Sequence, residues 1–461
     1  MSLPAPLLNA VSQQGGGRVV LVVGAGASFE EPTGLPLSRP ISLEAYRRLV
    51  ADGILAAEAC DKPEDLSCVA DAVVAATGKQ RDLVERMPVS SFKLAEPNEG
   101  YLVAACLLRE RAVSAVLTLN FDLGMTAALV RVGARDEIGI VSGPDEHHRL
   151  RLMNLIYLHR NANSRPEEWI LRTAALETEW QGRWEEVVAM RVMAAPVIVF
   201  AGLGSVASVL VRTVERVRKA VASGAAIFLV DPGERGNSEF FARLELPDDA
   251  YLQLGWCSFA IEMGERLLEE HRHGLESACR TLIADAGWDD PDPTDLCNRV
   301  AALGLRGLGE VRARWTLDEA PYAPEHSVAT PLVADLLLAV GVLERAGGCQ
   351  AVFDSDGIVE LRRGNEVLGC IAVATGGGFK RWDALEAAVR QHHHRRRARV
   401  ESPRVVLVSG VAGTKPAHIA PPSSIVPEET ADSIIDRGAS LRLISAEELR
   451  ASPGIADDIA A

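Results

Sequence analysis

The sequence predicts an α/β protein built on a parallel sheet that helices cover on both faces. Short apolar segments typical of buried strands recur along the first half, at Val19–Val23, Ala115–Leu119, Leu155–Leu158, Pro196–Ala201 and Ala225–Val230. Most are separated by stretches with apolar residues at helical spacing. Each segment is followed by a Gly, Asn, His or Asp residue. Because ligands of such folds bind beyond the carboxyl ends of the strands, we expect a site there.

Length and composition narrow the class of protein. The chain has 461 residues, enough for two or three domains, and its net charge of −15 argues against non-specific nucleic-acid binding by the whole molecule. A local basic patch stays possible. Eight cysteines occur without a Cys-x-x-Cys pair, which predicts reduced thiols and no zinc module. We expect a cytoplasmic protein without a membrane partner, because no signal peptide or membrane-spanning run is evident.

The first apolar segment ends in a glycine turn, Gly24-Ala25-Gly26-Ala27-Ser28. Backbone amides at a turn between a strand and a helix carry partial positive charge, which suits a pyrophosphate. The third glycine of the usual dinucleotide pattern is replaced by Phe29. An ordinary glycine turn of an α/β domain is therefore the alternative interpretation, and Ser28 could serve only as a helix cap.

Five segments over roughly residues 15–275 together resemble the sirtuin-like family. Gly24–Ser28 resembles its Gly-Ala-Gly-x-Ser nucleotide loop, and Gly34-Leu35-Pro36 its following Gly-Ile-Pro. Thr118-Leu119-Asn120-Phe121-Asp122 resembles Thr-x-Asn-x-Asp, and Tyr157-Leu158-His159 the segment with the catalytic histidine. Gly202-Leu203-Gly204-Ser205 falls where the family has a Gly/Ser turn near the adenosine ribose. The resemblance implies a Rossmann-like domain that takes NAD as substrate or ligand.

The resemblance also implies a set of site residues. The catalytic candidates are Asn120, Asp122 and His159. The positions expected to bind NAD are Gly24, Ala25, Gly26, Ser28, Pro36, Arg39, Thr118, Gly202, Gly204, Ser205 and Asp231.

The chemistry of NAD cleavage fits these residue types. Nicotinamide leaves as a neutral molecule from a cationic ring, so the site needs no acid and must hold the ribose and steer a nucleophile. Asn120 could position a water, His159 could deprotonate a ribose hydroxyl or a water, and Asp122 could orient one of these groups. The alternatives are that Asn120 and Asp122 cap the next helix and that His159 is an ordinary strand-end histidine.

Departures from the family pattern indicate which activity to expect. The four-cysteine zinc module of the deacetylases is absent, Arg160 stands where the family usually has Gly, and Leu37 and Ala207 replace its Asp residues. Protein deacetylation is therefore not expected. Members without zinc commonly hydrolyse NAD in bacterial anti-phage defence, which implies an NAD hydrolase acting as a homo-oligomer or as a subunit of a defence complex.

The second part of the chain resembles a PD-(D/E)xK restriction-endonuclease-like domain. Phe353–Leu361 is similar to its first strand, with Asp356 as a residual metal ligand, and Leu441–Leu449 to its last segment. In Ile371–Gly377, Ala372 and Ala374 occupy the positions of the family's Glu and Lys, so Mg²⁺ is expected only if that site were intact. Decay, deliberate inactivation and ordinary strand packing all stay open. The basic run 392–399 could contact DNA or be a solvated face.

The predicted organisation is a sirtuin-like domain at 1–280, a helical connector at 281–325 and a nuclease-like α/β domain at 326–461. Within the last domain we expect strands at Val352–Leu361 and Val367–Thr375, joined at Arg363-Gly364-Asn365. The leading hypothesis is an NAD hydrolase that releases nicotinamide and ADP-ribose. The alternatives are a nucleotide sensor that controls a metal-dependent DNA endonuclease, and a non-enzymatic, nucleotide-gated subunit.

Overall fold

The computed structural model describes residues 3–12, 17–172, 174, 195–204, 225–286, 292–315, 326–354, 358–375, 405–409 and 442–445. The chain divides into two compact units, Met1–Arg266 and Leu267–Ala461. Three predicted features, Ser205, Asp356 and the run 392–399, lie outside the described residues, as does Ala207.

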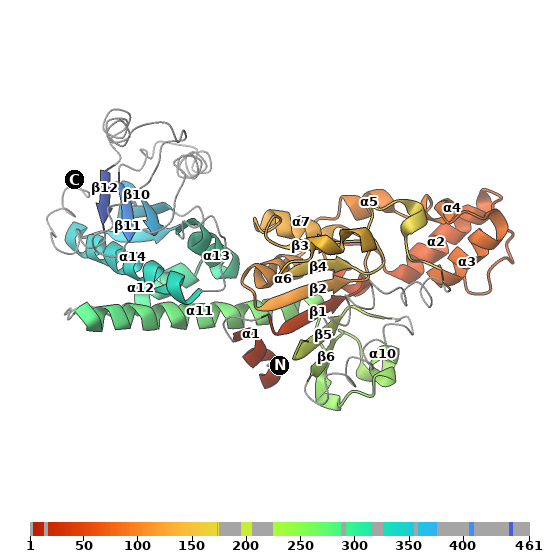
Figure 1. Cartoon of the computed structure of the whole chain (residues 1–461), viewed down its shortest axis with the longest axis horizontal. Coiled ribbons are helices and arrows are strands. Elements are labelled where there is room, and N and C mark those ends of the chain that lie inside the picture. Colours follow the sequence, from red (N-terminus) through yellow and green to blue (C-terminus); the bar gives the residue numbers. More distant parts are fainter. Residues whose placement is uncertain are drawn as a thin grey trace. The chain divides into compact units, whose positions relative to one another are not determined.

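The first unit contains a seven-stranded sheet in the order β3-β4-β2-β1-β5-β6-β7 (Figure 1). Its strands are β1 Val19–Val23, β2 Val113–Thr118, β3 Gly139–Val141, β4 Asn154–Tyr157, β5 Val197–Ala201, β6 Ala226–Val230 and β7 Tyr251–Leu252. All paired strands are parallel, which confirms the predicted Rossmann-like α/β class. The edge strands β3 and β7 were not predicted, because three and two residues are too few for a recognisable apolar pattern.

Strand order and register bring the predicted polar residues to one edge. Val23 of β1 is in register with Thr118 of β2 and Ala201 of β5, so the residues that follow these strands are level. The chain leaves β1 toward β2 on one side and later returns to β5 on the other. The sheet therefore has its topological switch point between β1 and β5, where ligands of doubly wound sheets bind.

Eight α-helices are described in the first unit before the long helix at its end. They are α1 Ala5–Ser12, α2 Ser38–Ala51, α3 Leu66–Thr77, α4 Arg81–Val84, α5 Val89–Lys93, α6 Glu99–Arg109, α7 Gly124–Arg131 and α10 Glu239–Arg243. Helix α6 packs on β2 and α7, whereas α1 packs on β1 and β5 (Figure 1). A separate apolar core unites α2 to α5 with Trp169 and Leu171, which follow β4, and with Leu35, which follows β1. This helical layer therefore lies on the carboxyl-end side of the sheet.

The second unit has a mixed five-stranded sheet in the order β12-β11-β10-β9-β8. Its strands are β8 Gln350–Phe353, β9 Ile358–Arg363, β10 Glu366–Thr375, β11 Val405–Ser409 and β12 Arg442–Ser445. The β9–β10 hairpin turns where the sequence predicts, and Gly364 has a φ of +62°. The predicted strand Val352–Leu361 is two strands, because β8 ends at Phe353 and β9 pairs back on it in antiparallel fashion.

Helix α11, Trp256–Ala286, begins in the first unit and ends in the second. Helices α12 Thr294–Ala301, α13 Gly304–Trp315 and α14 His326–Gly347 follow it. Cys297 and Val300 of α12 and Leu308 of α13 share one apolar core with α14, β8 and β9. The division between the units thus falls inside α11, at residues 266 and 267, and the segment expected as a connector contributes to the core of the second unit.

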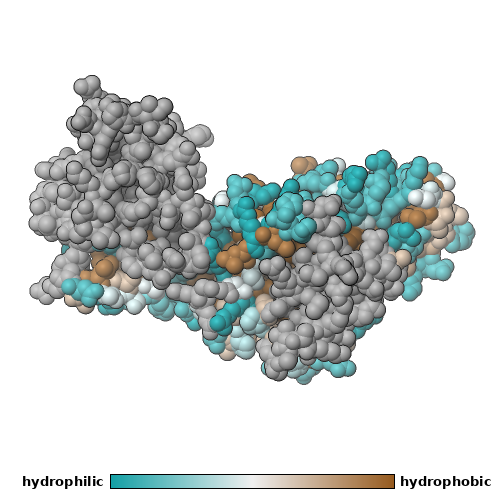
Figure 2. All heavy atoms as spheres, viewed as in Figure 1, coloured by the Kyte–Doolittle hydropathy of each residue, from teal (hydrophilic) through white to brown (hydrophobic). Residues whose placement is uncertain are grey.

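The described surface of the first unit is mainly hydrophilic on the face seen in Figure 2, with hydrophobic residues in small separate patches. Among the described residues, no helix has the length and apolarity needed to cross a membrane. The described residues also contain no cluster of three or more His, Cys, Asp and Glu side chains suited to a metal ion.

Candidate functional site

Two glycine loops meet at the switch point of the sheet. The amide of Gly24 donates to the Ala201 carbonyl at 2.9 Å, and the amide of Gly26 donates to the Gly202 carbonyl at 2.9 Å. A Cβ on Gly26 would lie 2.7 Å from the Cα of Gly202, and one on Gly202 would lie 2.4 Å from the Ala27 nitrogen. Gly202 also has a φ of +66°. Only glycine allows the loops after β1 and β5 to touch backbone to backbone.

This packing gives the glycines of the turn a different role from the one that the sequence predicts. The sequence interpretation assigned its amides to a pyrophosphate, but those of Gly24 and Gly26 are used by the β5 side of the sheet. The amides of Ala27 and Phe29 donate to carbonyls within the turn, which is a short 3-10 helix, Ala25–Ser28. Of the described groups none accepts from the Ala25 amide, so that amide is the one the turn leaves for a ligand.

The turn places Ser28 in a buried hydrogen-bond network with residues from two other elements. The Ser28 hydroxyl donates to Oδ2 of Asp122 at 2.7 Å and lies 2.7 Å from the Tyr101 hydroxyl. The Asn120 amide group donates to Ser28 at 2.9 Å, to the Gly24 carbonyl at 2.9 Å and to the Tyr101 hydroxyl at 3.2 Å. Since Ser28 gives its one proton to Asp122, Tyr101 must donate to Ser28. The resulting proton order is Tyr101 to Ser28 to Asp122.

The Thr-x-Asn-x-Asp segment after β2 folds so that both polar side chains turn inward. The hydroxyl of Thr118 accepts from the Asn120 backbone amide at 3.0 Å. The second oxygen of Asp122 accepts from the Gly124 amide at 2.9 Å, where α7 begins. Asp122 therefore caps the start of α7, as the alternative interpretation expected, and also accepts the hydrogen bond from Ser28. The described residues include no donor to the Asn120 side-chain oxygen, which leaves that oxygen for a ligand.

Tyr101 and Asn98 belong to the network and were not predicted as site residues. Asn98 begins α6, and its side chain accepts from the Tyr101 amide at 3.0 Å while donating to the Ala27 carbonyl at 2.8 Å. It thereby ties the start of α6 to the glycine turn. The signal in the sequence is a helix N-cap before an apolar run, which predicts a helix start and says nothing about its neighbours.

His159 follows β4 at the same edge, beside an aromatic wall. Its ring lies 6.4 Å from that of Phe121, which stacks on Trp169 at 4.4 Å with an interplanar angle of 14°. Strand β4 pairs with β2 in parallel register, so His159 lies at the strand end next to the one that carries Asn120 and Asp122.

Arg160, which stands where the sirtuin pattern has Gly, has a φ of +73°. This is the left-handed region that favours glycine, so Arg160 has a backbone conformation that is uncommon for a residue with a side chain. The Arg160 guanidinium donates to the Ser142 carbonyl at 3.2 Å, at the end of β3.

Burial sets the protonation of the three titratable groups. It raises the pKa of the Asp122 carboxyl, against the hydrogen bonds from Ser28 and the Gly124 amide. Burial and then the charge of Asp122 raise the pKa of Tyr101 well above its ordinary value, so the phenol stays a donor. Burial lowers the pKa of His159 to about 4, opposed by a hydrogen bond with the Leu119 backbone. His159 is therefore neutral at pH 7 and able to accept a proton.

The other predicted positions surround this centre at greater exposure. Pro36 and Arg39 are exposed at the start of α2, and Gly204 is exposed in the loop after β5. Asp231 follows β6, and its carboxylate accepts from the Gly233 amide at 2.7 Å. Ser205 lies outside the described residues.

No family model and no curated protein matches the chain. One similar solved structure is a Sir2 homologue mutant with 2'-O-acetyl ADP ribose, at 19% identity and a TM-score of 0.35, covering 58% of this chain and 97% of that one. Another is a Sir2 homolog–NAD complex, at 18% identity and a TM-score of 0.33, covering 59% and 96%. Such low values establish neither family membership nor activity.

Gly26→Ala tests the contact between the glycine loops. The added Cβ would meet backbone that cannot move aside cheaply, and we expect a loss of about 1–3 kcal/mol in the free energy of unfolding. Urea unfolding of the full chain measures it. Gly204→Ala is the matched control, because no atom of the residues that the structure describes lies within 4 Å of its added Cβ. Equal stability of the two variants would contradict the proposed packing.

The lowered pKa of His159 predicts a pH dependence of stability. Its folded pKa of about 4 lies below the unfolded value of 6.5, so the unfolded state binds a proton first as the pH falls. The stabilisation is complete above about pH 6.5 and declines toward pH 4; between pH 7.5 and 5 we expect about 1–2 kcal/mol, allowing for partial exposure. Urea unfolding at both pH values should show this loss for the unmodified chain and a smaller one for His159→Gln. An identical loss in both would disprove the assignment.

Proposed function

We propose that the first unit binds NAD at the carboxyl ends of β1, β2, β4 and β5 and hydrolyses its nicotinamide–ribose bond. The observation that carries the proposal is the buried network of Ser28, Tyr101, Asn120 and Asp122 beside the neutral His159. Sir2 homologues of similar fold have been solved with NAD and ADP ribose, which accords with this ligand class.

In this reaction Asn120 and His159 have separate roles. The Asn120 oxygen, left open by the network, accepts a hydrogen bond from a ribose hydroxyl or from the attacking water. The bond between the ribose anomeric carbon and the nicotinamide nitrogen breaks, and nicotinamide leaves with the electron pair. Water adds to the anomeric carbon, and its proton goes to His159. The products are nicotinamide, ADP-ribose and one proton.

Two further groups suit the rest of the dinucleotide. The Ala25 amide in the glycine turn and the exposed guanidinium of Arg39 at the start of α2 are donors to which we assign the phosphate oxygens. Asp122 keeps Ser28 and the turn in place and is a positioning residue. At the cellular level, the resemblance to zinc-free sirtuin-like proteins favours a role in bacterial anti-phage defence, exerted by depletion of NAD.

Nicotinamide release by the purified full-length protein tests the proposal. We expect His159→Gln to reduce the rate by about 10²-fold or more, because general-base catalysis contributes on that order. Asn120→Ala should also abolish release, but it removes buried hydrogen bonds, so its folding is checked by circular dichroism. Exposed His273 on α11 and Asn237 provide the matched controls His273→Gln and Asn237→Ala. Undiminished release in both site variants would refute the proposal.

A second candidate function rests on strand β10. Ala372 and Ala374 are two residues apart on a central strand, paired with Val406 and Val408 of β11, so they share one face of the sheet. In this alternative the first unit senses a nucleotide and controls a nuclease whose Glu and Lys are alanine here.

Restoring those two side chains tests the second candidate. The double variant Ala372→Glu/Ala374→Lys should cleave plasmid DNA in the presence of Mg²⁺, with and without NAD compared, because a carboxylate can then hold the metal. Ala372→Gln/Ala374→Met is the control of similar size without charge. Absence of metal-dependent cleavage by a folded double variant would count against a nuclease ancestry of this site.

A further inference from the structure

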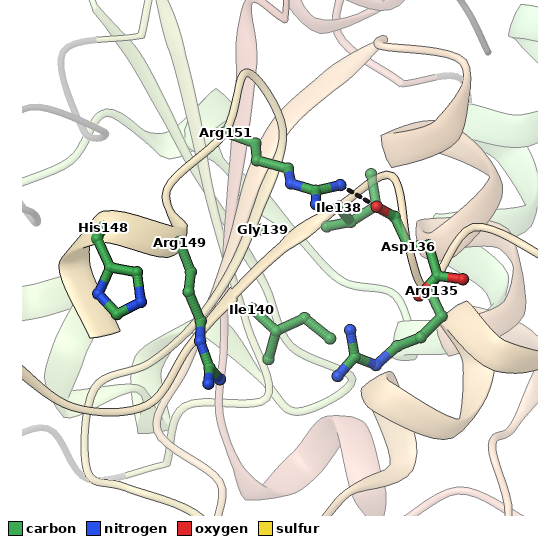
Figure 3. Close-up of a pocket in the computed structure, with 8 residues that line it drawn as sticks. All are labelled: Arg135, Asp136, Ile138, Gly139, Ile140, His148, Arg149 and Arg151. Carbon is green, nitrogen blue, oxygen red and sulfur yellow. Dashed lines mark hydrogen bonds between the residues drawn. The ribbon is translucent and has the colours of Figure 1, made fainter. Parts of the chain in front are cut away.

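A pocket of about 500 Å³ lies beside the edge strand β3 (Figure 3). Its polar lining comes from Arg135, Asp136, His148, Arg149 and Arg151, so that three guanidinium groups face a single carboxylate. Ile138 and Ile140 contribute the apolar part of the lining. Arg151 precedes β4 and His159 follows it, so the pocket and the candidate NAD site are at opposite ends of this strand. The four residues of β4 alone separate them by about 10 Å.

The pocket concentrates positive charge on a chain whose net charge is −15. Within the described part of the chain Arg135 has no carboxylate partner, and Arg151 donates to the backbone carbonyl of Asp136 rather than to its carboxylate. Arg149 donates to Glu146 at 2.9 Å and keeps further N–H groups. In Figure 3 the side chains of Arg135 and Arg149 reach from two sides toward the space beside Ile140. Arg135 and the remaining N–H groups of Arg149 and Arg151 can therefore donate to an anionic ligand.

Contacts at the backbone fix the segments that carry two of the arginines. Asn154, which is buried, accepts from the Arg151 amide at 2.8 Å and donates to the Arg151 carbonyl at 2.8 Å. Glu146 accepts from the Ser142 amide at 2.8 Å and from the Arg149 guanidinium at 2.9 Å. A Cβ on Gly139 would lie 2.5 Å from the Arg149 carbonyl oxygen, so glycine is needed for this close approach. The backbone around the pocket is thus ordered before a ligand binds, which lowers the entropic cost of binding.

We propose that this pocket binds a nucleoside diphosphate, a small anion that carries a diphosphate group and a planar aromatic ring. The guanidinium groups of Arg135, Arg149 and Arg151 bind the phosphate oxygens, and the ring lies on the surface of Ile138 and Ile140. The volume is within the range of small-molecule pockets. A site of this kind is independent of NAD cleavage and gives the first unit a second, separate nucleotide site.

Calorimetric titration of the full-length protein with ADP tests the proposal. We expect Arg135→Gln to weaken binding about tenfold and Arg135→Gln/Arg149→Gln about 10²-fold, because each exposed guanidinium contributes a charge-assisted hydrogen bond. Arg47→Gln on α2 is the control with the same change of charge, since that arginine is 73% exposed and lies outside the pocket. ADP carries the diphosphate of NAD and can also occupy the candidate NAD site, so the titration is fitted to two sites. His159→Gln, in the candidate NAD site, should retain ADP binding at the pocket.

The outcomes separate the pocket from the NAD site. Loss of ADP binding in the double arginine variant, with retention in Arg47→Gln and His159→Gln, supports the proposal whatever the result for nicotinamide release. Unchanged ADP binding in the double variant, or an equal loss in Arg47→Gln, overturns it. If a short DNA duplex binds the unmodified protein but not the double arginine variant, and ADP does not bind, the proposal is overturned in favour of a nucleic-acid contact.

Discussion

The close approach of two backbone loops is the constraint on which the candidate site depends. Gly26 and Gly202 touch through backbone atoms at the switch point between β1 and β5, and a side chain on either would push the loops apart. Their contact fixes the turn Ala25–Ser28, whose last residue must reach Asp122 and Tyr101. The glycines thus act first as packing residues, and what they offer a ligand is a consequence of that packing.

Each buried polar group of the network that this turn completes depends on the others for its hydrogen bonds. Ser28, Asn120 and Asp122 are buried, and an unpaired polar group in such surroundings costs on the order of 1–3 kcal/mol. Tyr101 and Asn98 supply the missing partners from α6, so the helix start and the glycine turn are held together by the same groups. Burial also keeps the Tyr101 phenol protonated and His159 neutral, which leaves one proton acceptor beside a rigid scaffold.

Strand β4 connects the two functional regions inferred for the first unit. Its amino end, at Asn154, anchors the arginine that lines the edge pocket, and its carboxyl end leads into His159 and the unusual backbone of Arg160. Strand β4 is buried throughout, so the two proposed sites are separated by packed core at opposite ends of one strand.

The sequence by itself determined the central strands β1, β2, β4, β5 and β6, because buried parallel strands are read from short apolar runs that depend only on neighbours in the chain. It also placed Ser28, Asn120 and Asp122 at strand ends. Only the tertiary structure decided that Tyr101 joins them, that the Gly26 amide serves β5, and that Arg135, Arg149 and Arg151 share one pocket. These contacts depend on strand order and register, which local periodicity does not encode.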